Sequence, residues 1–158
     1  MPQTVLIPTA GTGSRLGGLT SFLNKSLVSV SNKPAICFLI DKFPLETEFV
    51  IPVGYKSNLV IDFLELAYPN RNFKFIEIEL YEGEGSGLGL TITSCKEYLQ
   101  KPFIFMSCDS LVLEDIPKAE YDWMGYGHAK NHKNFRTVYV DGDIVMDICE
   151  KNADISKN

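Results

Sequence analysis

A glycine-rich loop near the amino terminus holds the first residues whose types and spacing could do chemistry. It reads Ala10-Gly11-Thr12-Gly13-Ser14-Arg15-Leu16-Gly17 and follows a short apolar segment. Successive backbone N–H groups in such a loop form a concavity that can bind phosphate. Arg15 adds a guanidinium, which suits bidentate contact with phosphate oxygens. Taken alone, the loop is explained equally well as a glycine turn with a solvated surface arginine.

The loop differs from two common phosphate-binding motifs. A dinucleotide fingerprint, Gly-x-Gly-x-x-Gly, would need glycine where this chain has Leu16. A Walker A loop would end in Gly-Lys followed by Ser or Thr, and the chain contains no such run. A nicotinamide-dependent oxidoreductase therefore rests on the glycines alone, and it is the weakest of the functions that the sequence suggests.

The segments that must position this loop alternate between strand and helix patterns. Apolar runs predict strands over 4–8, 49–53, 73–80 and 103–106. Helices are predicted from Pro34 to the stop at Pro44, over 57–67, and after the glycines through Leu99. For the helix over 57–67, Ser57 is the expected cap, with Leu59, Phe63 and Leu66 on one face. Residues 138–148 read as a hairpin whose tight turn is Asp141-Gly142.

This alternation predicts an α/β fold: a mostly parallel, Rossmann-like sheet sandwiched by helices, with a small β-hairpin near the carboxyl end. In such sheets, ligands bind at the carboxyl ends of the strands. The first glycine loop, a second one over 82–89, and Asp109 all follow predicted strands. Asp109 could also simply cap the turn that Ser110 continues.

Several motifs together resemble the nucleotidyltransferases that activate sugar phosphates and phosphocholine. In order, they are Gly-Thr-Gly-Ser-Arg-Leu at 11–16, Leu19-Thr20, Lys25 and Lys33-Pro34. That family usually has proline before the lysine; Asn24 stands there, so we expect a less rigid loop around Lys25. The resemblance continues through Glu82–Gly89, a base-recognition loop; Met106-Ser107-Cys108-Asp109, a metal-binding strand end with cysteine for glycine; and Ile148-Cys149-Glu150-Lys151, a Glu-Lys motif.

The resemblance implies a nucleotidyltransferase fold and a role for each motif. A nucleoside monophosphate would pass from a nucleoside triphosphate to a small phosphorylated acceptor, and pyrophosphate would leave. The implied catalytic residues are Arg15, Lys25 and Lys151, the last steadied by Glu150; the implied cofactor is Mg²⁺, held by Asp109. The implied nucleotide-binding residues are Ala10, Gly11, Thr12, Gly13, Ser14, Arg15, Glu82 and Gly87.

The acceptor classes implied are sugar 1-phosphates and phosphocholine-like compounds, used for capsule or other surface polysaccharides. Glu82 can only accept hydrogen bonds, which suits an amino proton of cytosine or guanine, or an imino proton of uracil or thymine. We favour CTP among these. A nucleotide-binding or regulatory module without turnover is the main alternative.

Composition bounds these functions. The chain has 158 residues, 45% of them apolar and 22% charged, which fits one domain over 1–158. A net charge of −5 argues against a nucleic-acid partner. No apolar run approaches the length of a membrane span, and four scattered cysteines suggest a reducing, cytoplasmic location. The family that these motifs resemble usually continues past the Glu-Lys motif, so a truncated chain, a minimal variant and an inactive half are the three expectations. A homo-oligomer also stays open.

Overall fold

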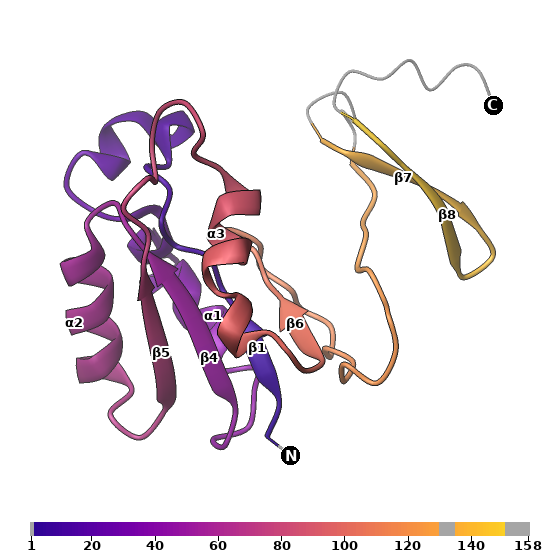
Figure 1. Cartoon of the computed structure of the whole chain (residues 1–158), viewed down its shortest axis with the longest axis horizontal. Coiled ribbons are helices and arrows are strands. Elements are labelled where there is room, and N and C mark those ends of the chain that lie inside the picture. Colours follow the sequence, from indigo (N-terminus) through magenta and orange to yellow (C-terminus); the bar gives the residue numbers. More distant parts are fainter. Residues whose placement is uncertain (1, 130–134, 151–158) are drawn as a thin grey trace. The chain divides into compact units, whose positions relative to one another are not determined.

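The computed structural model describes residues 2–129 and 135–150, which divide into two compact units, 1–120 and 121–158. The larger unit contains a parallel sheet in the order β5-β4-β1-β6 (Figure 1). Its strands are β1 (Thr4–Leu6), β4 (Glu48–Val53), β5 (Asn72–Glu77) and β6 (Phe103–Phe105). This arrangement confirms the predicted α/β fold with a mostly parallel sheet.

Three α-helices connect these strands: α1 (Ala35–Ile40), α2 (Ser57–Ala67) and α3 (Leu88–Ser94). The chain moves from β1 to β4 to β5 in one direction and then returns to β6 on the other side of β1. Because crossovers between parallel strands are right-handed, this reversal places α3 on the face opposite α1 and α2. In Figure 1, α3 lies in front of the sheet and α1 behind it.

The core follows from the alternation of side chains along the strands. Leu6 and Val50 point to the α3 face, where they pack with the buried Cys95. Phe49 points to the other face, with its ring 5.9 Å from Phe43 and 5.7 Å from Phe73. The residues of β1 and all but the first of β4 are buried, as expected for central strands covered on both faces.

Short elements complete the larger unit. Three 3₁₀-helices are present: η1 (Ser14–Thr20), η2 (Lys25–Leu27) and η3 (Lys96–Tyr98). The strands β2 (Ser29–Val30) and β3 (Lys33–Pro34) form a two-stranded antiparallel ribbon just before α1. Within the described residues, no helix is long and apolar enough to cross a membrane.

The predicted details of α2 are wrong in two respects. Ser57 is the first helical residue; the cap position is Lys56, in the left-handed region with φ 53°, and no side chain caps the helix. Val60 and Leu64 form the buried face, whereas Leu66 is 85% exposed. Periodicity alone did not fix the rotation of a helix on which apolar residues cover more than half of the circumference.

The smaller unit contains the predicted hairpin, formed by β7 (Thr137–Asp141) and β8 (Ile144–Cys149). Its turn lies one residue later than predicted: Asp141 pairs with Ile144, so Gly142 and Asp143 are the two turn residues. Gly142 has φ 57° and takes the first turn position, where two-residue hairpins of one common type place glycine. The assignment of residues 1–158 to one domain stays a prediction.

Candidate active site

The first glycine loop is tied to the carboxyl end of the neighbouring strand. Just after β1, the Thr9 backbone N–H and hydroxyl both donate to the Pro52 carbonyl, each at 2.9 Å. The Ala10 carbonyl then accepts from the Tyr55 N–H at 2.8 Å. The loop therefore begins at the point where the strand order reverses, between β1 and β6. That point is where open parallel sheets bind ligands.

Gly13 lets this loop close over the lysine segment. It has φ 67°, and a Cβ placed on it would lie 2.9 Å from the Lys25 Cβ and 3.1 Å from Thr20 Cγ2. Its carbonyl accepts from the Leu16 N–H at 2.9 Å and from the Thr20 hydroxyl at 3.4 Å. Both the left-handed backbone and the close approach therefore require glycine here.

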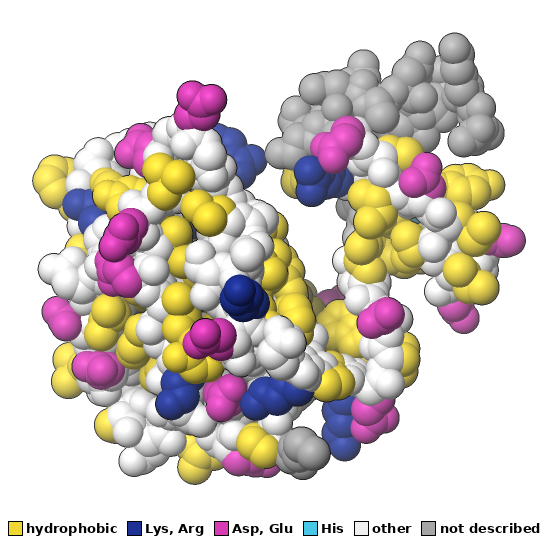
Figure 2. All heavy atoms as spheres, viewed as in Figure 1, with side chains coloured by type: hydrophobic (Ala, Val, Ile, Leu, Met, Phe, Trp, Pro, Cys, Tyr) yellow, Lys and Arg dark blue, Asp and Glu magenta, His cyan; other side chains and the backbone are white. Residues whose placement is uncertain are grey.

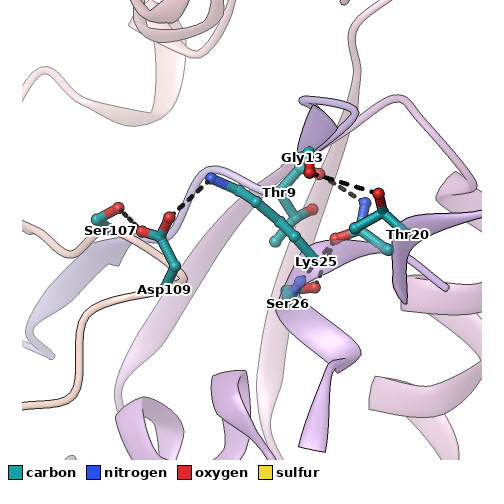
Figure 3. Close-up of polar contacts among 8 residues, drawn as sticks. Thr9, Gly13, Thr20, Lys25, Ser26, Ser107 and Asp109 are labelled. Carbon is teal, nitrogen blue, oxygen red and sulfur yellow. Dashed lines mark hydrogen bonds and ion pairs between the residues drawn. The ribbon is translucent and has the colours of Figure 1, made fainter. Parts of the chain in front are cut away.

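Lys25 and Asp109 meet at the carboxyl ends of β1 and β6. Lys25 Nζ lies 3.3 Å from Asp109 Oδ2, and the Ser107 hydroxyl donates to the other carboxylate oxygen (Figure 3). The two residues are 84 positions apart in the sequence. Their side chains are 21% and 46% exposed, so both can reach a ligand at the surface.

The surroundings of Asp109 favour its charged form. Burial alone would raise the pKa of this carboxyl, but the Ser107 hydroxyl and the Lys25 ammonium together lower the pKa below its usual value. The carboxylate is therefore ionised at neutral pH. By contrast, burial raises the pKa of the neighbouring Cys108 thiol to about 11, so this thiol stays protonated. It packs as a small apolar group rather than as a nucleophile.

Asp109 fits one part of a magnesium site. Mg²⁺ in phosphate-transferring sites uses one or two carboxylates and completes its shell with substrate phosphates and water. Within the described residues, no group of three His, Cys, Asp or Glu side chains could hold a metal. A cation here would therefore depend on oxygens supplied by the substrate.

Arg15 and the loop amides are placed to meet a ligand from solvent. Arg15 is exposed, and among the described residues it takes part in no hydrogen bond or ion pair. Gly11 and Ser14 are also exposed, Thr12 is half-buried, and Ala10 is buried. The predicted phosphate loop thus presents a guanidinium whose charge is not already neutralised by a carboxylate in the described part of the chain.

The second glycine loop is linked to the first through Gly54. A Cβ on Gly54 would lie 2.9 Å from the Tyr81 Cβ and 3.0 Å from the Ala10 carbonyl oxygen. Tyr81, the residue before Glu82, therefore packs beside the start of the first loop. Glu82 and Gly87 are both exposed, and Gly87 adopts φ 146° directly before α3. The helix predicted to follow this loop begins at Leu88, inside the predicted loop over 82–89. It ends at Ser94 as α3, and the separate 3₁₀-helix η3 follows Cys95.

Lys151, the third predicted catalytic residue, lies outside the described residues. Its neighbour Glu150 belongs to the smaller unit, where its carboxylate pairs with Arg136 at 2.9 Å for Nη2 and 3.1 Å for Nε. This pair, which joins the residues directly preceding β7 and following β8, was not predicted from the sequence. The role of Lys151 and its support by Glu150 stay predictions.

Asn24 contradicts one expectation drawn from the sequence. The prediction of a less rigid lysine loop is wrong, because the Asn24 side chain is fully buried and makes four hydrogen bonds. One part of this arrangement could have been read from the sequence. Asparagine side chains in turns often accept a hydrogen bond from the backbone N–H two residues later, which here belongs to Ser26. The partners that follow other strands could not be read from the sequence.

A separate groove lies at the amino-terminal ends of the strands. Its walls include Gln3, Thr47 and Pro102, which precede β1, β4 and β6, respectively. Among the predicted site residues that the structure describes, none lines this groove. Within the larger unit, the predicted site residues instead follow the carboxyl ends of the strands, where open parallel sheets bind ligands.

Comparison with known proteins finds a distant curated relative. No family model matches the chain. It is 26% identical over 150 residues to the bifunctional protein GlmU of Methanococcus vannielii, covering 92% of this chain and 34% of that protein. The chain thus spans about a third of the length of this curated relative.

Solved structures with the same fold include CTP:phosphocholine cytidylyltransferase from Streptococcus pneumoniae, with 23% identity and a TM-score of 0.67. HddC from Yersinia pseudotuberculosis, complexed with GMP-PN, has 21% sequence identity to this chain and a TM-score of 0.63. Both matches cover 94% of this chain, and 64% and 69% of those chains, respectively. UDP-glucose pyrophosphorylase gives a TM-score of 0.58 at 21% identity, over 75% of this chain and 50% of that chain.

The chain therefore has the nucleotidyltransferase fold that sugar-1-phosphate and phosphocholine nucleotidyltransferases share. It is a distant relative of GlmU.

Proposed function

We propose that this chain carries the nucleotide-binding part of a Mg²⁺-dependent nucleotidyltransferase. The observation that carries the proposal is the meeting of Lys25 Nζ with Asp109 Oδ2, 3.3 Å apart, beneath a glycine loop at the reversal of strand order. A cationic and an anionic group at such a point suit a ligand that brings both phosphates and a metal ion.

In the proposed reaction, a phosphate oxygen of the acceptor attacks the α-phosphorus of a nucleoside triphosphate, and pyrophosphate leaves. Both reactants are anionic, so catalysis consists mainly of positioning and charge neutralisation. The amides of residues 11–14 and Arg15 would bind the β- and γ-phosphates. Lys25 would stabilise charge on the α-phosphate, and Lys151, steadied by Glu150, would contact the acceptor. Mg²⁺ bound at Asp109 would neutralise further phosphate charge.

The Lys25–Asp109 pair must separate for this to happen. Both side chains are partly exposed, and exposed ion pairs contribute only about 0–1 kcal/mol. A triphosphate with its metal can therefore replace the pair at small cost, giving Lys25 a phosphate partner and Asp109 a cation. The pair keeps both groups in place and charged until the ligand arrives.

We propose CTP as the nucleotide and a small phosphorylated compound as the acceptor, leading to a precursor of a surface polysaccharide. The names of the similar proteins include CTP, UDP-glucose and GMP-PN, so this fold accommodates several bases. The CTP proposal depends on Glu82 as a hydrogen-bond acceptor.

The surface and the cysteines support small partners and a cytoplasmic location. On the face shown in Figure 2, acidic and basic side chains of the described residues are interspersed, without the basic stripe that nucleic-acid binding uses. All four cysteines are free, as is usual in a reducing compartment.

Thermal unfolding of the full chain tests the nucleotide half of this proposal. CTP, UTP, dTTP, GTP, ATP and NAD are each added with and without Mg²⁺. A ligand at about 100 times its dissociation constant adds roughly 2.7 kcal/mol of stability. We expect a metal-dependent shift with CTP. A shift with another triphosphate would reassign the base, and a shift with NAD alone would contradict the proposal.

A nucleotide-binding module without turnover is the second candidate. It is favoured by the finding that, among the described residues, no group of three His, Cys, Asp or Glu side chains could hold a metal ion. Pyrophosphate release with a panel of sugar 1-phosphates and phosphocholine separates the two functions. Release with any acceptor excludes the second candidate, whereas nucleotide binding without release would support it.

A further inference from the structure

The Asn24 side chain uses the full hydrogen-bonding capacity of an amide. Its Nδ2 donates to the Thr9 carbonyl at 2.8 Å and to the Tyr55 carbonyl at 2.7 Å. Its Oδ1 accepts from the Ser26 N–H at 3.0 Å and the Ser26 hydroxyl at 2.8 Å. An amide has two donor hydrogens and two acceptor lone pairs, so all four are satisfied. A reversed amide would set its oxygen against two carbonyls, which fixes the orientation.

These partners come from separate parts of the chain. Thr9 follows β1, Tyr55 follows β4, and Ser26 belongs to η2, which begins at Lys25. The Asn24 side chain is 0% exposed and occupies the space between these two strand ends. The next residue, Lys25, reaches Asp109 beyond β6. Figure 3 shows Thr9 and Ser26 beside the base of the Lys25 side chain.

The Asn24 backbone is fixed as well. Asn24 has an extended conformation, with φ −68° and ψ 147°, and it is the cap residue directly before η2. The value of φ is the one to which a proline ring would lock this position. Two properties therefore direct Lys25: the backbone angle at residue 24 and the side-chain bridge from residue 24 to the carboxyl ends of β1 and β4.

We propose that Asn24 is a positioning residue that holds Lys25 against the α-phosphate of the nucleotide, through the bridge to Thr9 and Tyr55. This inference rests on the proposed function for its catalytic consequence, but its structural part does not. Lys25 Nζ is the group that acts on the substrate, whereas Asn24 acts only through it.

Three replacements separate the two properties. N24A removes the bridge and relaxes the backbone. N24D keeps the shape and the acceptor for Ser26 but cannot donate to the Thr9 and Tyr55 carbonyls. N24P removes the bridge and keeps φ near −65°. The control is N58A, because Asn58 is an exposed residue on α2 outside this hydrogen-bonded cluster.

Steady-state turnover in the full chain is the first measurement. We expect N24A and N24D to lower kcat by about 10- to 100-fold with a smaller change in KM, because misplacing a catalytic group by about 1 Å can cost 100-fold. K25M should lower kcat by about 100- to 1000-fold. The double variant N24A/K25M should match K25M, since Asn24 acts through Lys25. N24P should recover part of the loss, and N58A should equal the wild type.

A proximity measurement needs no turnover. In NMR spectra of the full chain, we expect a nuclear Overhauser contact between the Lys25 ε-methylene and the Asp109 β-methylene. The contact should be lost in N24A and N24D and kept in N58A. If the wild type has no activity, the proposed function fails while this measurement still decides the positioning role.

Two results would overturn the inference. One is an N24A or N24D protein that keeps both wild-type kcat and the Lys25–Asp109 contact. The other is a loss in N24A that multiplies with the loss in K25M, because the effect would then not pass through the lysine. Should N24A fail to fold, N24D and N24P provide the same comparison.

Discussion

The two glycine loops of this chain look alike in sequence but differ in how they are held. The first, residues 10–17, is anchored to distant parts of the fold together with the end of η1: the Ala10 carbonyl accepts from the Tyr55 N–H, and the Tyr55 hydroxyl donates to the Thr20 carbonyl at 2.9 Å. The second, residues 82–89, makes only local bonds among the described residues. The N–H and hydroxyl of Ser86 both donate to the Gly83 carbonyl, at 3.2 and 2.6 Å.

This difference matches the different tasks proposed for the loops. A phosphate site gains from a rigid backbone, because donors held in place need not reorganise when charge develops. A loop that reads a base can adjust to its ligand, at the cost of ordering when the ligand binds. Composition alone does not make a glycine loop rigid; contacts with residues far away in the sequence do.

The largest effect is expected from R15A. Removal of a donor to transition-state charge costs about 100- to 1000-fold in turnover. Stability should stay within about 0.5 kcal/mol, because Arg15 is exposed and unpaired among the described residues. E82A, in the second loop, should mainly change nucleotide preference. Normal turnover of R15A in a pyrophosphate-release assay would show that the phosphate loop is misassigned.

The next effect compares G13A with G83A. Both glycines have positive φ, 67° and 87°, so alanine costs each about 1–2 kcal/mol of stability. Only at Gly13 would the new Cβ meet the Lys25 Cβ, at 2.9 Å, which adds about 1–3 kcal/mol of overpacking. Urea unfolding measures both. Equal losses would mean that the first loop is not packed against the lysine segment.

A smaller effect is expected from Y55F. The lost hydrogen bond to the Thr20 carbonyl should lower the free energy of unfolding by about 1 kcal/mol. Y81F is the matched control, because the Tyr81 ring lies 6.3 Å from that of Tyr55 but its hydroxyl has no such partner among the described residues. If Y81F loses as much unfolding free energy as Y55F, the hydrogen bond from Tyr55 does not anchor the first loop more strongly than the second.

The smallest effect concerns native-state hydrogen exchange. The Leu16 amide, bonded to the Gly13 carbonyl within the first loop, should exchange more slowly than the Ser86 amide, because opening the first loop breaks contacts with other segments. Addition of the triphosphate and Mg²⁺ should slow exchange in the second loop more than in the first. Equal protection of both loops in the free protein would contradict the comparison.

Much of the fold could be predicted from local patterns. The apolar runs of β1 and β4 are continuous because these central strands are buried, and turn residues bound them. The prediction failed where local patterns are degenerate. Leu66 fits an apolar helical face, yet it is exposed, since the rotation of α2 depends on what β4 and β5 present. Strand β5 ends at Glu77, so Leu80, placed in the predicted strand, is 45% exposed.

The order of residues was enough to specify the chemistry available: a glycine loop with Arg15, a lysine ten residues on, and an aspartate after an apolar strand. Which of these groups meet depends on how the strands pack. The Lys25–Asp109 contact spans 84 residues and requires β1 and β6 to be neighbours, which local propensity does not encode. The same holds for Asn24, whose side chain is buried between two strand ends that are distant in sequence. Hydrogen bonds between separate segments form only when the sheet has assembled.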